Sequence, residues 1–194
     1  LHFIGLASFG GVHSSLDHLF ALIDAAILQG QRRIYVHAIT DGRDRPPEDS
    51  VNEVGRLVEF IAAKRLADPS LELVIASVIG RYYAMDRDKR WERTKKAYDL
   101  YVHGTGETFH DTLEAITSQH AKGTTDEFLE PRFLASGGLS RSPVIREEDS
   151  LVFFNFRADR MRQIVSSFFA DFKGFERPFL PNVHLTSLTE YQAD

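Results

Sequence analysis

The chain has 194 residues, and its hydrophobic content of 43% and charged content of 26% are typical of a globular protein with a sizeable core. The net charge of −5 argues against a general nucleic-acid binder, which would present a basic face. The absence of cysteine excludes disulfides and thiolate metal sites and is compatible with a reducing compartment. The longest apolar runs are far shorter than a membrane span, so we expect no membrane partner. From the negative net charge we expect no nucleic-acid partner either.

The first third of the chain alternates between strand and helix patterns. Residues 1–8 are apolar and end at a Gly-Gly pair, which is typical of a strand followed by a tight loop. Residues 14–30 place apolar side chains at helical spacing, with a serine to cap the start and Gly30 to close the end. Residues 32–40 are rich in β-branched and aromatic side chains and predict a second strand, which the stretch DGRDRPP ends.

A second helix and a third strand follow. Apolar residues at helical spacing predict a helix over residues 51–61, with Ser50 and Glu53 as a capping box at its start. Residues 71–80 are nearly all apolar, which predicts a strand that helices cover on both faces.

The remaining patterns predict three more helices and two more strands. The helices are expected in the second half of the polar insert 80–104, around 110–121 and over 158–172, and the strands over 150–156 and 184–188. Alternation of strands and helices predicts an α/β fold, with a mostly parallel sheet and helices on both faces in a three-layer sandwich. We expect one domain over residues 1–194, because no repeat or low-complexity linker interrupts it.

Arginines follow most of the predicted strands. Ligands of open parallel sheets bind outside the carboxyl ends of the strands, so the residues that follow each strand are the candidate site. These residues are His13, Arg43, Asp44, Arg81, Arg87, Arg90, Arg157 and Arg160. Arginine pairs with both oxygens of a carboxylate or phosphate, and several arginines predict an anion with more than one negative charge. Arg157 and Arg160 are three residues apart, which predicts that they share a face in the first turn of the helix over 158–172.

Two members of this set can move protons. His13 can titrate near neutral pH, and Asp44 is a carboxylate among cations, so both are candidate catalytic residues for a substrate hydroxyl. No histidine pair lies with carboxylates in a metal-ligand pattern, so no metal is expected to bind. Structural roles are expected for Asp41 as a turn former, Asp159 in a helix first turn and Lys89 in a solvated charge run.

Five segments carry a resemblance to a known family. They are GGVHS at 10–14, HAITDGRDRPP at 37–47, GRYYAMDRDKRW at 80–91, TDEF at 125–128 and FFNFRADRMRQ at 153–163. Over essentially the whole chain, and in the family's order, they resemble the cofactor-independent (2,3-bisphosphoglycerate-independent) phosphoglycerate mutases. Phe9 departs from the resemblance, because the family usually has Asp or Asn there, and an apolar group can repack the loop that carries His13.

The resemblance implies the inserted transferase domain of a two-domain isomerase. The parent enzyme would be a monomeric cytoplasmic protein of glycolysis that interconverts 2-phosphoglycerate and 3-phosphoglycerate. Its phosphatase domain, absent here, would carry two Mn²⁺ ions and a transiently phosphorylated serine, so the isolated chain is expected to be inactive. The lack of an initiator Met also suggests a piece of a longer protein. The implied substrate contacts are His13, Arg43, Asp44, Arg81, Arg87, Arg157 and Arg160, which is the strand-end set without Arg90.

Two alternatives use the same residues. A non-catalytic module that binds small phosphorylated or carboxylate anions would need the arginines and no phosphatase partner. A stand-alone, metal-free hydrolase built on His13 and Asp44 is the weaker alternative, because the sequence offers no activated nucleophile.

Overall fold

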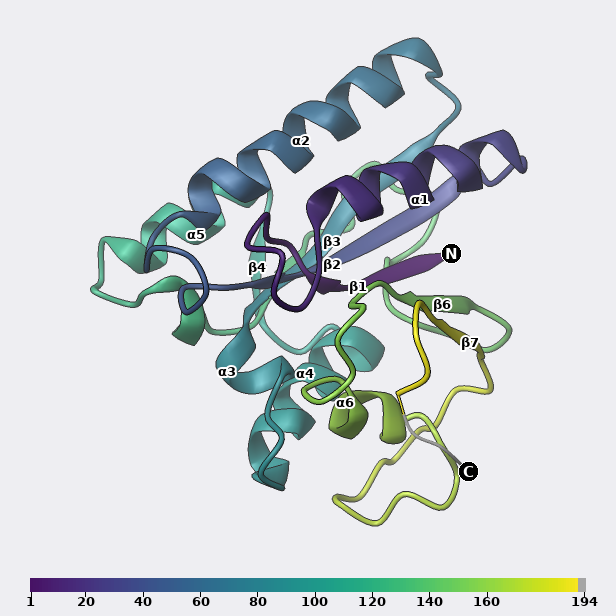
Figure 1. Ribbon diagram of the computed structural model, residues 1–194. Coiled ribbons are helices and arrows are strands. Elements are labelled where there is room, and N and C mark those ends of the chain that lie inside the picture. Colours follow the sequence, from purple (N-terminus) through teal and green to yellow (C-terminus); the bar gives the residue numbers. More distant parts are fainter. Residues whose placement is uncertain (192–194) are drawn as a thin grey trace.

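A computed structural model describes residues 1–191 and contains a central sheet between two layers of helices (Figure 1). The strands are β1 His2–Leu6, β2 Arg33–Thr40, β3 Glu72–Gly80, β4 Glu107–Phe109, β5 Arg132–Leu134, β6 Ser150–Phe153 and β7 His184–Ser187. Their order across the sheet is β4-β5-β3-β2-β1-β6-β7. All neighbouring strands are parallel except β5, which runs antiparallel to β3. The predicted α/β fold with a mostly parallel sheet is therefore confirmed.

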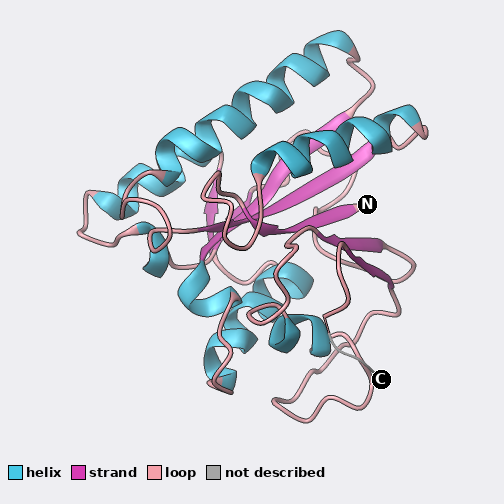
Figure 2. Ribbon diagram, viewed as in Figure 1, coloured by secondary structure: helices cyan, strands magenta, loops and turns pink. Residues whose placement is uncertain are grey.

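The helices cover both faces of this sheet (Figure 2). Their bounds are α1 Leu16–Leu28, α2 Ser50–Ala67, α3 Arg81–Ala84, α4 Trp91–His103, α5 Thr112–His120 and α6 Arg162–Ser166, with a 3₁₀ turn η1 at Asp126–Phe128. Within residues 1–191, none of these helices combines the length and the apolar character needed to cross a bilayer.

Each face of the sheet has its own apolar core. Leu19 and Leu57, from α1 and α2, are fully buried in one core, which α5 also joins. Tyr98 and Ile164, from α4 and α6, are fully buried in the other. The β-branched residues of the central strands divide between these two cores, which is why the strands read as continuous apolar runs. This arrangement is the predicted three-layer sandwich.

The helix capping predicted from the sequence is confirmed at α1 and wrong at α2. Ser15 caps α1 by accepting a hydrogen bond from the Asp17 amide, and Gly30 follows the helix with φ +87°. The capping box predicted for Ser50 and Glu53 is wrong. Ser50 is the first helical residue and its hydroxyl donates to Asp126, while Glu53 points away from its own helix end to the loop after β1.

The helix predicted over residues 158–172 is also wrong in its extent, because α6 spans only five residues. Beyond Ser166 the chain forms an irregular turn in place of a longer helix, and the Arg177 guanidinium stabilises that turn by binding its carbonyls. Arg177 Nη1 donates to the carbonyls of Ser167 and Phe169 at 2.7 and 2.8 Å. At the other end, Arg157 and Arg160 precede α6, so they do not share a helix face as predicted.

Two short strands and one short helix were not predicted. Strands β4 and β5 each have three residues, too few to show an alternating pattern. Helix α3 has four residues and begins directly at the end of β3, where the apolar run gives way to RYYA. It brings Arg81 to the carboxyl end of the sheet.

The loop after β6 packs so closely on β1 that Gly5 has no room for a side chain. A Cβ at Gly5 would lie 2.7 Å from Asn155 Oδ1 and 2.9 Å from the Phe154 ring. We predict that Gly5→Ala lowers the free energy of unfolding by about 1–3 kcal/mol because it overpacks this contact. Gly55→Ala is the matched control, since nothing lies within 4 Å of its Cβ position in α2.

Urea unfolding of the two variants measures the effect. The control should be more stable than the wild type by roughly 0.5–1 kcal/mol, as expected for alanine in a helix interior. Equal stability changes in both variants would contradict the tight contact at Gly5.

Candidate functional site

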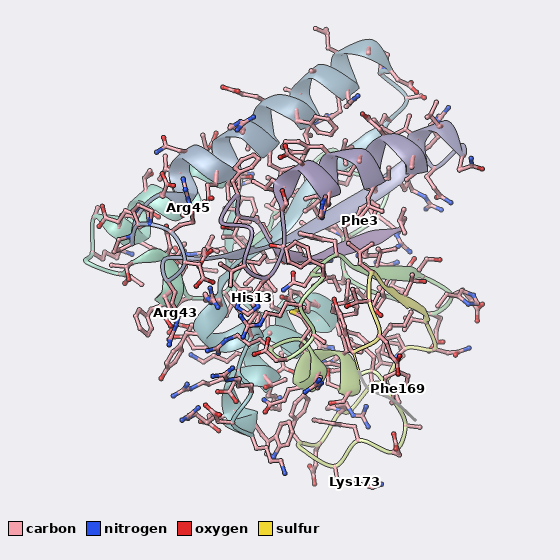
Figure 3. All side chains as sticks on the ribbon, viewed as in Figure 1. Phe3, His13, Arg43, Arg45, Phe169 and Lys173 are labelled. Atoms are coloured by element: carbon pink, nitrogen blue, oxygen red, sulfur yellow. The ribbon has the colours of Figure 1, made fainter. Side chains whose placement is uncertain are left out.

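The predicted site residues gather where the parallel strands end. His13 lies in the loop after β1, Arg43 and Asp44 in the loop after β2, and Arg81 at the end of β3. Figure 3 shows His13 and Arg43 on the same side of the molecule, with nitrogen-bearing side chains clustered beneath them. The topology therefore unites residues that are far apart in the sequence.

Arg81 is the centre of a buried ionic network. Its side chain is only 3% exposed, and Nη1 donates to Asp41 Oδ1 at 2.7 Å and to Asp44 Oδ2 at 2.6 Å. Its Nη2 lies 3.0 Å from His13 Nε2. Burying a guanidinium is costly unless carboxylates and further acceptors surround it, and three residues from two loops meet that need here.

Burial and contact with Arg81 together determine the protonation of His13. A guanidinium can only donate, so His13 Nε2 is an acceptor and the ring proton lies on Nδ1. Burial, followed by the charges of Arg81 and Arg157, lowers the His13 pKa to about 4 despite the opposing effect of Asp159 and Asp44. His13 is therefore neutral at pH 7 in the free chain.

Asp41 has both the structural role expected for it and a second one. Its Oδ1 accepts hydrogen bonds from the Arg43 and Asp44 amides at 3.2 and 3.0 Å, which forms the predicted turn. It is also 1% exposed and bonded to Arg81. Burial alone would raise the Asp41 pKa, but hydrogen bonds from the Asp44 amide and Arg81 outweigh it and lower the pKa.

Asp159, predicted to have only a structural role in a helix first turn, joins two arginines of the site. Its Oδ2 accepts from Arg87 Nη1 at 2.7 Å, and its Oδ1 lies 2.9 Å from Arg157 Nε. The same oxygen is 3.8 Å from His13 Nδ1. Asp159 lies before α6, which begins at Arg162, and not in its first turn as predicted, and its position among charged side chains could not be read from the sequence.

Four of the predicted arginines line one cavity of about 420 Å³. They are Arg43, Arg81, Arg87 and Arg160. Three of the predicted residues lie outside this cavity. His13 and Asp44 contact Arg81, which lines it. Arg157 pairs with Asp159, which in turn binds Arg87.

Arg90, which the strand-end argument had included and the resemblance had not, also lines the cavity. The lining residues that the sequence did not predict are Tyr82, Met85, Asp86, Asp88, Arg93, Glu127 and Phe128.

The charge of this cavity is shown most clearly at Arg160. Burial, and then the charges of Arg87, Arg81 and Arg43, lower the Arg160 pKa. Arg160 is held by one hydrogen bond of 3.3 Å from Nη1 to the Met85 carbonyl. The guanidinium groups therefore repel one another in the absence of an anion, and an anion in the cavity would relieve that repulsion.

Aromatic side chains form one wall of the cavity. The Arg93 guanidinium lies 3.7 Å from the centroid of the Tyr82 ring, and the rings of Tyr82 and Phe128 are 4.9 Å apart. Phe128 is 43% exposed, and Arg43 pairs with the adjacent Glu127 at 3.3 Å. The cavity is thus cationic at its base and partly apolar at this wall.

Phe9 does not enter the site. Its ring packs 6.2 Å from that of Phe20 and lies 4.3 Å below the Arg56 guanidinium, on the side of α1 and α2. Its amide donates to Glu53 Oε1 at 2.8 Å, which holds the loop in place. The His13 side chain meets Arg81 with Phe9 in this position.

Metal ligands form no cluster in the part of the chain that the structure describes: within residues 1–191, no group of three or more His, Asp or Glu side chains could hold a metal ion. The carboxylates of the site are engaged by arginines instead. The residues present therefore do not suit the manganese ions that the resemblance implies for the parent enzyme.

The neutral state of His13 is a testable property. We predict that its ring titrates with a pKa of about 4 in two-dimensional NMR spectra, well below 6.5. Because the unfolded chain binds this proton at a higher pH, His13 lowers stability as the pH falls from about 6.5 to about 4.

Global stability alone cannot report on His13, because burial also lowers the pKa of His2 and of His37. A His13 midpoint near 6.5 would contradict the contact between its Nε2 and Arg81.

Comparison with known proteins assigns the family. The family model described as "BPG-independent PGAM N-terminus (iPGM_N)" matches residues 1–193. The 2,3-bisphosphoglycerate-independent phosphoglycerate mutases of Moorella thermoacetica and Myxococcus xanthus are 45% and 44% identical to this chain. Each match covers 98% of this chain and 36% of the relative, so the chain spans about a third of the length of these proteins.

A solved structure gives the same answer. The crystal structure of Leishmania mexicana phosphoglycerate mutase at low cobalt concentration superposes with a TM-score of 0.91 and 32% identity. The match covers 98% of this chain and 35% of that one. The chain therefore belongs to the family of N-terminal domains of the BPG-independent phosphoglycerate mutases.

Proposed function

We propose that this chain is the phosphoglycerate-binding domain of a mutase that interconverts 2-phosphoglycerate and 3-phosphoglycerate. The observation that carries the proposal is the 420 Å³ cavity at the strand ends, which six arginines and three carboxylates line. This excess of fixed positive charge suits a small molecule that bears both a phosphate and a carboxylate. Membership of the mutase family supports the same substrate.

The arginines divide into two groups. Arg81 uses Nη1 for two carboxylates, so it organises the base of the cavity and contributes positive potential rather than a free fork. Arg160 and Arg43 are less fully neutralised, since one donates to a carbonyl and the other pairs with Glu127 at 3.3 Å. We assign these two, with Arg87, to direct contact with the substrate anions, and Arg157 to the rim beside Asp159.

Proton transfer falls to Asp44 rather than His13. Moving a phosphoryl group to or from a substrate hydroxyl requires that the hydroxyl oxygen gain or lose a proton. Asp44 is 23% exposed and accepts a hydrogen bond from Arg81, which lines the cavity. His13 has its acceptor nitrogen engaged by Arg81 and a pKa of about 4, and its buried Nδ1 faces Asp159 Oδ1 at 3.8 Å, so it supports Arg81 and Asp159 rather than taking a proton from the substrate.

The rest of the parent enzyme supplies the chemistry that this chain lacks. The proposal includes a phosphatase domain with a phosphoserine intermediate and two Mn²⁺ ions, in a monomeric cytoplasmic enzyme of glycolysis. We therefore expect no turnover by this chain alone. Mutase activity that copurified with it and survived a metal chelator would contradict this division of labour.

Substrate binding is the direct test. We predict that 3-phosphoglycerate binds saturably in calorimetric titration and that Arg160→Ala weakens the affinity by at least about tenfold, since a hydrogen bond to a charged group contributes roughly 1.5–3 kcal/mol. Arg32→Ala is the matched control, because Arg32 is exposed before β2, at the opposite end of that strand from the cavity.

The control removes the same charge and should change the affinity by less than about twofold. An equal loss in both variants would mean that only net charge matters. Failure of the wild-type chain to bind 3-phosphoglycerate would contradict the proposed function.

A further inference from the structure

Gln163 is a buried polar side chain that joins three segments around the cavity without lining it. It lies in α6 and is 8% exposed. Its Nε2 donates to Asp86 Oδ2 at 3.0 Å and to Thr94 Oγ1 at 3.1 Å, and its Oε1 accepts from the Lys89 amide at 2.6 Å. One amide group thus connects α6, α4 and the loop of residues 85–90.

The loop of residues 85–90 depends on these contacts for its shape. Lys89 adopts φ +60°, a left-handed conformation that is unfavourable for a residue with a Cβ. Asp86, which is 5% exposed, accepts hydrogen bonds from the amides of Asp88 and Arg90 at 3.0 Å each. Gln163 holds the Lys89 amide and Asp86 together, so it fixes both the strained residue and the carboxylate that organises the turn.

This loop carries Arg87, and the segment just before Gln163 carries Arg160. Both guanidinium groups line the cavity, and the charge of Arg87 lowers the pKa of Arg160. Like charges that face one cavity tend to move apart unless their backbones are held. The Gln163 amide is a direct link between the two backbones, together with the weaker bond from Arg160 to the Met85 carbonyl.

We propose that Gln163 is a positioning residue that holds Arg87 and Arg160 at a separation suited to one anionic group of the substrate. This inference rests on the proposed function and deepens it. An amide is the side chain required here, because it donates to the Asp86 carboxylate and accepts from the Lys89 amide at the same time. Leucine would fill the space but would leave the Lys89 amide unsatisfied and remove one donor from Asp86, and glutamate would place a second carboxylate against Asp86.

The test is a double-mutant cycle on the affinity for 3-phosphoglycerate. We expect Gln163→Leu to weaken binding about tenfold when Arg87 is present, and by less than about twofold when it is combined with Arg87→Ala. A purely structural role would lower the affinity equally in both backgrounds. Equal losses, or no loss at all, would overturn the proposal.

Tyr98→Phe is the matched control for lost stability. Tyr98 is buried, and its hydroxyl makes one bond of 2.7 Å to the Phe179 carbonyl, away from the residues that line the cavity. This variant should lose stability and keep its affinity for 3-phosphoglycerate within about twofold. If it loses affinity as Gln163→Leu does, general destabilisation explains both variants and the proposal is wrong.

A measurement without ligand separates this inference from the proposed function. Amide hydrogen exchange should be slow at Lys89 in the wild type and faster in Gln163→Leu, with protection of β1 to β3 unchanged. If the wild type fails to bind 3-phosphoglycerate, the proposed function fails, and the exchange result still decides whether Gln163 holds the loop. Unchanged exchange at Lys89 in Gln163→Leu would overturn the inference.

Discussion

The buried guanidinium of Arg81 is the interaction on which the site depends. It binds Asp41 and Asp44 through one nitrogen and His13 through the other, and it is 3% exposed. Removing one partner of such a cluster leaves an uncompensated buried charge, so the loops after β1 and β2 and the end of β3 are fixed relative to one another. This mutual dependence turns three separate strand ends into a single surface.

The same network explains the electrostatic character of the cavity. Because Asp41 and Asp44 are occupied by Arg81, they are less available to neutralise the other arginines that line the cavity. The residual repulsion is visible in the lowered Arg160 pKa. An anion in the cavity would relieve this repulsion. Outward movement of the loop of residues 85–90 would relieve it too, and the hydrogen bonds of Gln163 to that loop oppose such a movement.

Much of the fold could be predicted because its signals are local and strong. The apolar runs and helical spacings identified the central strands and α1, α2, α4 and α5. The prediction failed where contacts outside the helix matter: Arg177 binds carbonyls of the turn that follows α6, and Glu53 accepts from the Phe9 amide in the loop after β1 instead of capping its own helix.

The candidate site, like the fold, has a part that sequence rules identify and a part that depends on contacts between distant residues. The rule that parallel strands present their carboxyl ends together identified six arginines, five of which line the cavity. The roles of Asp159 and Gln163 were not predictable, because each depends on contacts with residues more than 70 positions away in the sequence.

A crystal structure of this chain with 3-phosphoglycerate would show whether the site exists before the substrate binds. We expect the ligand to lie in the cavity with its phosphate or carboxylate bonded to Arg87 and Arg160. We also expect Arg81 to keep its bonds to Asp41 and Asp44, as in the free chain. A ligand bound outside this cavity, or an Arg81 that leaves its carboxylates to bind the ligand, would contradict a site that is built before the substrate arrives.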